Sequence, residues 1–198
     1  MPLSSIDCQQ SIMSNNDQLD NTIPVFCTAK IPPEILVVNS IQLLNEFLAE
    51  AFEAKELKEV GCTHIAILVD TTDISKLTKP SRPPVKNDLN YPFLGWKLDE
   101  LVEFARQFDR TAHGIIDTEF VILDDQSIKD KTAVLVTPSE MSDNLETAPR
   151  LTARSDFRSS LITLNVKSIG VGGDEPWEHA AENNSVIRLY GENPGAGA

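Results

Sequence analysis

Short apolar runs alternate with an amphipathic segment in the first half of the chain, and this alternation limits the possible folds more than any other feature. Residues 35–38 (ILVV) and 64–69 (HIAILV) have the length and composition of buried strands. Between them, over residues 41–60, apolar side chains recur every three or four positions, which predicts a helix. Asn39 or Ser40 would cap its beginning. Strands that alternate with helices are typical of an α/β protein.

The second half continues this pattern with less regular spacing. Further strands are predicted at residues 119–123, 132–136, 160–166 and 186–190, and further helices at residues 95–108 and 174–182. A tight turn at residues 129–131 would join two of the strands as a hairpin, while residues 138–152 are polar and rich in turn formers. The sequence therefore predicts an α/β fold, a single layered domain with a mixed β-sheet of about six strands and three main helices.

Composition divides the chain into a folded part and two flanking segments. Residues 1–24 are polar and contain no Lys or Arg, so they are expected to form an N-terminal arm, and residues 192–198 a flexible tail. The single α/β domain then covers residues 25–191. Within it, residues 71–95 contain four of the twelve prolines and form an insertion loop, either a lid over a binding site or a plain insertion.

The formal net charge of −13 restricts the partners of this chain. Nucleic acids and anionic membranes bind clustered Lys and Arg, so neither is an expected partner, whereas a basic protein is. No apolar run reaches the length of a membrane span, and no secretory signal is recognisable. Cys8, Cys27 and Cys62 do not have metal-ligand spacing, and we expect free thiols in a cytoplasmic protein. Neither a metal nor a cofactor is predicted, and the sequence does not indicate an oligomeric state.

A glycine-rich turn near the C-terminus is the first candidate for a ligand site. Gly170, Gly172 and Gly173 follow a predicted strand and precede a predicted helix, as in loops that bind phosphate. Asp174 is expected to cap the helix. Its charge would repel phosphate, and the glycine spacing departs from the dinucleotide fingerprint. The alternatives are a structural turn and a site for an uncharged or cationic ligand, bordered by Trp177 and His179.

Polar residues follow three of the predicted strands and form a second candidate site. Asn39, Asp70 and the pair Asp124–Asp125 would lie along one edge of the sheet if these strands are parallel. Carboxylates gathered there could bind Mg²⁺ or transfer protons, although aspartate at a strand end also commonly begins a turn.

Two other positions carry side chains that binding sites often use. His113, Asp117 and Glu119 have the character of metal ligands, although their spacing matches no known motif and an acidic turn is the alternative. Trp96 lies at a predicted helix start beside the proline-rich loop, where it would pack against that loop and border a ligand.

Two resemblances to known families can be stated on particular residues. Residues 35–70 resemble a degenerate response-regulator receiver domain, in which Asp70 would be the phosphoacceptor, although Asn39 and Ser40 replace the acidic pair of that family. A longer stretch is similar to a family of small proteins known as a domain of unknown function. The matching positions are Gly95 with Leu101, Asp124, Phe157 with Arg158, and the segment from Leu161 to Asn165. This second resemblance implies an α/β fold without a known activity and points to Asp124, Arg158 and Asn165.

Three functions remain open from the sequence, and it does not decide whether the protein is an enzyme. The leading hypothesis is a module that binds a small molecule or another protein, with ligand-binding candidates Trp96, Asn165, Gly172, Gly173, Trp177 and His179. The first alternative is a small cofactor-free isomerase, cyclase or lyase, with catalytic candidates Asp70, His113, Asp124 and Arg158. The second is an acidic inhibitor or immunity-type protein that binds a basic partner.

Overall fold

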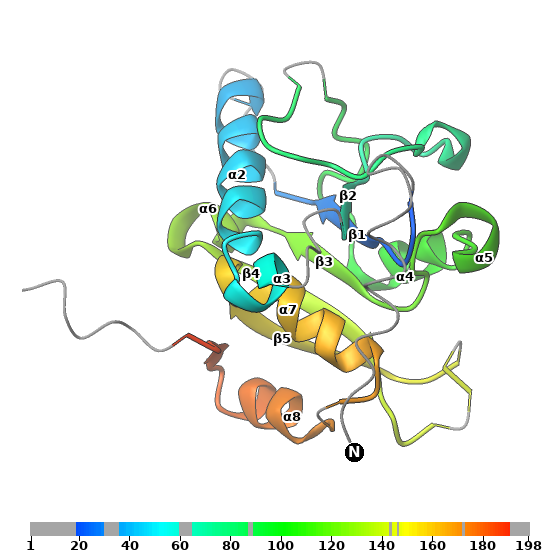
Figure 1. Cartoon of the computed structure of the whole chain (residues 1–198), viewed down its shortest axis with the longest axis vertical. Coiled ribbons are helices and arrows are strands. Elements are labelled where there is room, and N and C mark those ends of the chain that lie inside the picture. The colour runs from blue at the N-terminus through cyan, green and yellow to red at the C-terminus, as the bar shows by residue number, and fades with distance from the viewer. Residues whose placement is uncertain are drawn as a thin grey trace, which may run out of the picture.

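Six strands form one mixed sheet with helices on both faces (Figure 1). The computed structural model describes residues 19–29, 36–59, 65–86, 89–142, 144–145, 147–171 and 173–190, and only the backbone of residues 36–40. The strands are β1 (Ile23–Cys27), β2 (Ala66–Leu68), β3 (Phe120–Leu123), β4 (Thr132–Pro138), β5 (Arg150–Asp156) and β6 (Val186–Ile187). The predicted α/β class with a mixed sheet in a single domain is thus confirmed.

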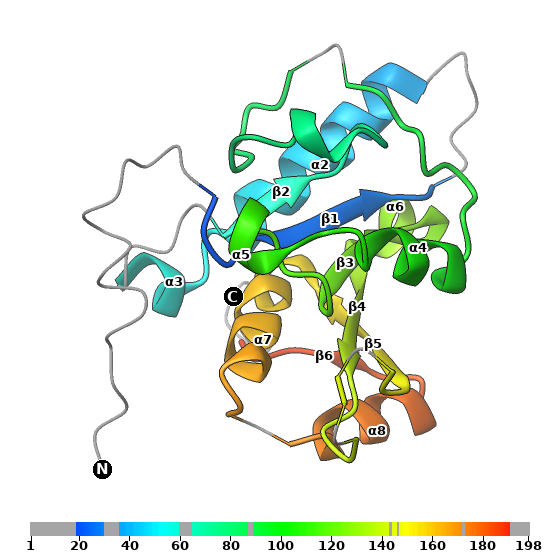
Figure 2. The ribbon, with the colours of Figure 1, turned by 90° about the vertical axis from the view of Figure 1, so that its right-hand side faces the viewer.

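The strand order is β2-β1-β3-β4-β5-β6, which combines a parallel half and a largely antiparallel half. In the first half, β1 lies between β2 and β3 and is parallel to both. In the second half, β4 is antiparallel to β3 and β5, and β6 is parallel to β5 (Figure 2). The carboxyl ends of β1, β2 and β3 therefore lie at one edge of the sheet.

Seven α-helices and one 3₁₀ helix connect the strands of the described chain. They are α2 (Leu36–Ala51), α3 (Lys55–Glu59), η1 (Ile74–Lys76), α4 (Leu98–Ala105), α5 (Arg110–His113), α6 (Asp125–Asp130), α7 (Phe157–Ser168) and α8 (Glu175–Glu182). The sequence predicted three main helices, and the short connecting helices are additional. No described helix is both long and apolar enough to span a lipid bilayer.

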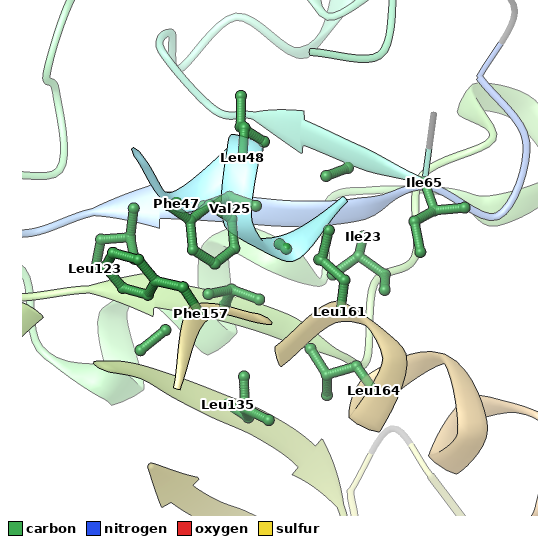
Figure 3. Close-up of a cluster of buried hydrophobic side chains, with 14 of the residues drawn as sticks. Ile23, Val25, Phe47, Leu48, Ile65, Leu123, Leu135, Phe157, Leu161 and Leu164 are labelled. Atoms are coloured by element: carbon green, nitrogen blue, oxygen red, sulfur yellow. The ribbon is translucent and has the colours of Figure 1, made fainter. Parts of the chain in front are cut away.

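Each face of the sheet buries its own apolar cluster, because successive side chains of a strand point to opposite faces. On one face, α2 and α7 pack together through Phe47 and Phe157, whose ring centroids are 5.3 Å apart (Figure 3). Strand residues such as Val25 and Leu135 lie beneath these rings. On the other face, α4 and the proline-rich loop cover an aromatic cluster around Phe26.

The proline-rich insertion loop packs against β2, at the edge of the sheet. The Ser81 amide donates to the Ala66 carbonyl (2.8 Å), and the Leu68 amide donates to Ser81 Oγ (2.9 Å). The same loop buries Leu77 and Phe93 in the second apolar cluster. These bonds satisfy backbone groups of an edge strand that would otherwise be open to pairing with another chain.

Two predicted strands are helices in the structure. Residues Leu36–Val38 belong to α2, so the predicted strand at residues 35–38 is wrong, and Asn39 lies inside the helix instead of after a strand. A short continuous apolar run fits a buried helix as well as a strand. Residues 160–166 lie in α7, because their alternating pattern also places Phe157, Leu161 and Leu164 on one helical face. The side chain of Asp156 caps this helix by accepting from the Ser159 amide (2.8 Å).

Two strands were missed by the sequence patterns. β1 begins at Ile23, within the segment expected to be an arm, and it is central although it contains Pro24. Proline within a strand usually indicates an edge position, which concealed this one. β5 alternates polar side chains with Ala153 and Ser155, which are buried, so its sequence lacks the apolar run that the prediction required.

The connection between β3 and β4 also differs from the predicted hairpin turn. These strands pair in antiparallel fashion, as expected, but the helix α6 joins them. Asp124 begins α6 as its cap and accepts hydrogen bonds from the amides of Gln126 (3.1 Å) and Ser127 (3.0 Å).

Candidate functional site

The four catalytic candidates do not converge. His113 ends α5, next to Gly114, whose carbonyl accepts from the Thr22 amide at the beginning of β1. Asp124 follows the end of β3, which is parallel to β1, so these two residues lie at opposite edges of the sheet. Asp70 follows β2 at the same edge as Asp124, but β1 lies between the two strands and separates their ends by about 10 Å.

Three of these side chains have separate partners elsewhere in the fold. Asp124 forms an ion pair with Arg154, which also donates to Thr132 Oγ1 (2.9 Å). His113 Nδ1 accepts from the Asp109 amide (3.1 Å). The guanidinium of Arg158 lies 4.5 Å from the ring centroid of Tyr190.

Arg158 and its partners hold the chain after β6 against α3. The Tyr190 hydroxyl donates to a carboxylate oxygen of Glu56, on α3, while Arg158 lies over the Tyr190 ring. Burial, together with the hydrogen bond to Glu56, raises the pKa of Tyr190 to about 12. Arg158 therefore has a structural partner on the surface of the fold, whereas Asp124 pairs with Arg154.

The ligand-binding candidates are also distributed over several elements. Trp177 is buried among apolar side chains, and the Trp96 ring packs edge-on against Phe93 (5.0 Å) and Phe104 (6.2 Å). Asn165 is half-buried on α7, and its carbonyl accepts from Ser168 Oγ (2.9 Å). Gly173 and His179 are exposed, whereas Gly172 lies outside the described residues.

The glycine-rich turn joins two helices instead of a strand and a helix. Gly170 has a φ of +71°, a conformation that favours glycine, and its amide donates to the Lys167 carbonyl (2.9 Å) at the end of α7. Asp174 precedes α8 at the capping position, but its carboxylate makes no capping hydrogen bond. The predicted capping role is therefore wrong, because this carboxylate binds another part of the chain.

A buried ion cluster, which we call the clasp, connects this turn to the loop after β4. It consists of Lys167, Asp174, Ser139 and Glu140. Lys167 Nζ lies 2.6 Å from Asp174 Oδ1 and 2.7 Å from Glu140 Oε1. Asp174 Oδ2 accepts from Ser139 Oγ (2.8 Å) and from the Glu140 amide (3.0 Å). The Lys167 and Asp174 side chains are only 3% and 9% exposed, so this pair is shielded from solvent, whereas Glu140 is partly exposed.

Burial and hydrogen bonding act in opposite directions on the charges of the clasp. Burial alone would lower the pKa of Lys167, but its bonds to Asp174 and Glu140 outweigh burial and raise it. Burial alone would raise the pKa of Asp174, but the bonds from Lys167, Ser139 and the Glu140 amide lower it. Both groups are thus stabilised in their charged forms, and the clasp holds its two loops in one arrangement.

Glu119 is the second buried charge of this region, and the sequence indicated it only as a potential metal ligand. Its side chain is buried beside Thr137, whose hydroxyl lies 3.5 Å from Glu119 Oε1. Burial raises the pKa of Glu119 to about 7, although Arg110, Lys167 and Arg150 act to lower it. His113, the other potential ligand, is exposed, and no group of three His, Cys, Asp or Glu residues in the described chain is arranged to hold a metal.

Replacing Glu119 by glutamine should make stability less dependent on pH. The unfolded carboxyl loses its proton near 4.5 and the folded one near 7, so the native protein loses stability as the pH rises between these values, by about 3 kcal/mol in total. Relative to the native chain, Glu119→Gln should therefore gain up to this amount at about pH 8 and little at about pH 4. Urea unfolding at both pH values measures this change in the free energy of unfolding. Glu178→Gln, which replaces an exposed glutamate of α8, is the control. An equal difference at both pH values would contradict the expectation.

Three open clefts mark the surface of the described chain. One of about 350 Å³ lies between α4 and the segment before β5, lined by Leu98, Asp99, Val102, Glu103, Arg106, Ala148 and Arg150. Another of about 530 Å³ separates η1 from α5 and includes His113. The third, of about 310 Å³, lies between β5 and α8 and includes Arg154. Of the four catalytic candidates, only His113 lines one of these three clefts.

Comparisons of the chain with protein-family models, curated proteins and solved structures gave no match. The two resemblances stated from the sequence therefore stay predictions.

Proposed function

We propose that the protein is an interaction module that binds a basic protein partner through the two loops joined by the clasp. These are the loop between β4 and β5 and the turn between α7 and α8, and we call them the clasp loops. The observation that carries the proposal is where the exposed apolar side chains lie. Among the described residues, five large apolar side chains are exposed, and four of them belong to the clasp loops: Met141 (89%), Leu145 (51%), Ile169 (60%) and Val171 (38%).

The clasp explains how these side chains are presented together. Met141 directly follows Glu140, and its amide donates to Ser139 Oγ (3.2 Å). Ile169 lies two residues after Lys167 in the sequence, and Val171 lies three residues before Asp174. Lys167 and Asp174 bind Glu140 and Ser139 and so join the two loops, whose backbones are seen in Figure 2. These bonds limit the movement of the apolar side chains beside them. A surface ordered before binding loses less entropy when it associates.

The charges around the clasp loops favour a basic partner. Glu140 is 46% exposed beside Met141, and Glu175, Glu178 and Glu182 are exposed on α8, which begins where the second loop ends. The whole chain has a net charge of −13. An apolar centre with an acidic surround attracts a positively charged surface and accelerates its association. This arrangement supports the inhibitor or immunity-type alternative over the enzyme alternative, whose four residues lie apart.

The proposal is tested by binding measurements on the full chain. The variant Met141→Ser/Ile169→Ser removes two exposed apolar side chains, and Leu189→Ser removes the fifth one, outside the clasp loops. Proteins retained by the immobilised native chain from an extract of the source cells would be identified, and their affinities measured for the three chains. We expect a basic protein that binds the native chain and Leu189→Ser equally, and the double variant at least about tenfold more weakly.

The salt dependence of binding and the oligomeric state of the chain distinguish the proposed function from its alternatives. Binding that depends on charge should weaken strongly at about 0.5 M salt, where opposite charges are screened. Equal retention by all three chains, or retention of acidic proteins only, would contradict the proposal. A dimer of this chain that dissociates in the double variant, measured by light scattering during gel filtration, would instead assign the clasp loops to a second copy.

A further inference from the structure

We propose that the cleft beside α4 is a binding site for a small zwitterion with an aliphatic side chain, of the α-amino acid class. In this site Arg150 would bind the carboxylate and Asp99 the ammonium group. The cleft has a volume of about 350 Å³, within the range of about 300–1,000 Å³ that is common for small-molecule sites. Its lining includes Ala148 of the loop between β4 and β5, but none of the four exposed apolar side chains of the clasp loops, so the two proposed sites use different side chains.

One part of the cleft is apolar. Leu98 and Val102 lie one turn apart on α4, and Ala148 faces the cleft from the segment before β5. Val102 and Ala148 are almost fully buried, at 8% and 6% exposure. An aliphatic group of a ligand would complete the burial of these side chains, which favours binding.

The charged lining is balanced, in contrast to the chain as a whole. It contains two cations, Arg106 and Arg150, and two anions, Asp99 and Glu103. Glu103 and Arg106 form an ion pair with each other on α4. Asp99 is exposed and has no ion-pair partner among the described residues. Arg150 forms no ion pair with a carboxylate of the cleft lining, although Asp117 and Glu119 are near enough to act on its charge.

Arg150 has a hydrogen-bond donor that the described chain does not satisfy. Its Nη1 donates to the Leu145 carbonyl (3.0 Å), which fixes the guanidinium at the side of the cleft. Its Nε is buried and has no hydrogen-bond partner in the described part of the chain. Burial and the neighbouring Arg106 lower the pKa of this guanidinium, while Asp117 and Glu119 act in the opposite direction. A carboxylate that draws Arg150 toward the cleft would accept from Nε and a second nitrogen, the paired arrangement that guanidinium groups favour.

The same lining disfavours ligands that carry only one kind of charge. A simple anion would meet Asp99 and Glu103 as well as the negative field of the chain. A simple cation would be attracted by that field but would lie beside Arg150 and leave its Nε without an acceptor. A zwitterion is neutral overall, so the acidic chain does not repel it, and each of its ends finds an opposite charge. The cleft therefore favours a zwitterion over the anionic ligands that arginine side chains alone would bind.

Calorimetric titration with leucine and two analogues tests the proposal. N-acetyl-leucine lacks the ammonium group, and 3-methylbutylamine lacks the carboxylate. Leucine should bind the full chain, and each analogue should bind at least about tenfold more weakly, since each loses one charged hydrogen-bonding group. No binding of leucine at about 10 mM, or equal binding of either analogue, would overturn the proposal.

Two variants locate the binding and keep the test independent of folding. Asp99→Asn changes an exposed residue, so the chain should fold normally, and it should weaken leucine binding about tenfold while leaving N-acetyl-leucine unaffected. Asp125→Asn is the matched control, because Asp125 is exposed on α6 and does not line the cleft. Arg150→Met should abolish leucine binding at unchanged circular dichroism. Leucine binding that is insensitive to Asp99→Asn would show that the ligand lies elsewhere.

Discussion

Replacing Lys167 by methionine is expected to destabilise the protein by about 3–5 kcal/mol. Methionine keeps the length and apolar stem of the side chain but removes its charge. Asp174, whose side chain is 9% exposed, would then be a buried carboxylate without its cation. Leaving one member of a buried ion pair uncompensated is among the most destabilising changes that a single substitution makes. Urea unfolding followed by circular dichroism measures the free energy of unfolding.

Two further variants show whether the unpaired carboxylate of Asp174 causes the destabilisation. Lys131→Met removes a lysine that pairs with Glu46 at the surface, with 43% and 31% exposure, and should cost less than about 1 kcal/mol. Lys167→Met/Asp174→Asn removes both charges of the buried pair in the clasp and should recover part of the loss. If Lys167→Met proves as stable as the native chain, the clasp does not hold the loops together.

The clasp should also respond to acid in a defined direction. Bonds from Lys167, Ser139 and the Glu140 amide lower the pKa of Asp174 below its unfolded value. Its contribution to stability is therefore present at neutral pH and is lost as the pH falls through that lowered pKa. The destabilisation caused by Lys167→Met should accordingly diminish in acid, where Asp174 is protonated.

Replacing Phe26 by alanine is the second large expected effect, a loss of about 3–5 kcal/mol. Phe26 is fully buried on the central strand β1, on the face that α4 covers. Its ring centroid lies 5.0 Å from that of Phe93 and 5.4 Å from that of Phe120, in edge-to-face contacts. Alanine would leave a cavity among these rings and would remove their mutual contacts.

Phe26→Leu is the matched control for this substitution. Leucine retains most of the apolar volume, so the loss should be only about 1.5 kcal/mol or slightly more, because the ring contacts disappear. Thermal and urea unfolding of both variants would compare them. Equal stability of Phe26→Ala and the native chain would show that this aromatic cluster is not the core of the second face.

The elements that could be predicted are those whose own residues determine their structure. The helix of residues 41–51 has an apolar repeat that no strand would use, and β3 and β4 have apolar runs of strand length. Residues 160–166 fit both periods, and only the packing of Phe157 against Phe47 on α2 decides for a helix. β1 and β5 depend on their neighbours in the sheet, since β1 contains Pro24 and β5 is largely polar.

The candidate site was less predictable, because tertiary contacts create it. The glycine turn and Asp174 were recognised, but the partners of Asp174 are Ser139 and Lys167, and Ser139 lies 35 residues away in sequence. Local patterns therefore suggested a helix cap where the structure has a buried ion cluster. Likewise, the exposure of Met141 and Ile169 depends on which side chains the fold leaves uncovered. Residue types alone do not specify this.

Hydrogen exchange on the complex with the basic partner tests the proposed interaction most directly. The amides of residues 139–142 and 168–171 should exchange more slowly when the partner is bound, and those around Leu189 should be unchanged. The protection should disappear in Met141→Ser/Ile169→Ser and persist in Leu189→Ser. Protection confined to the α4 cleft or to the edge at which Asp124 lies, with the clasp loops unchanged, would contradict the proposed function.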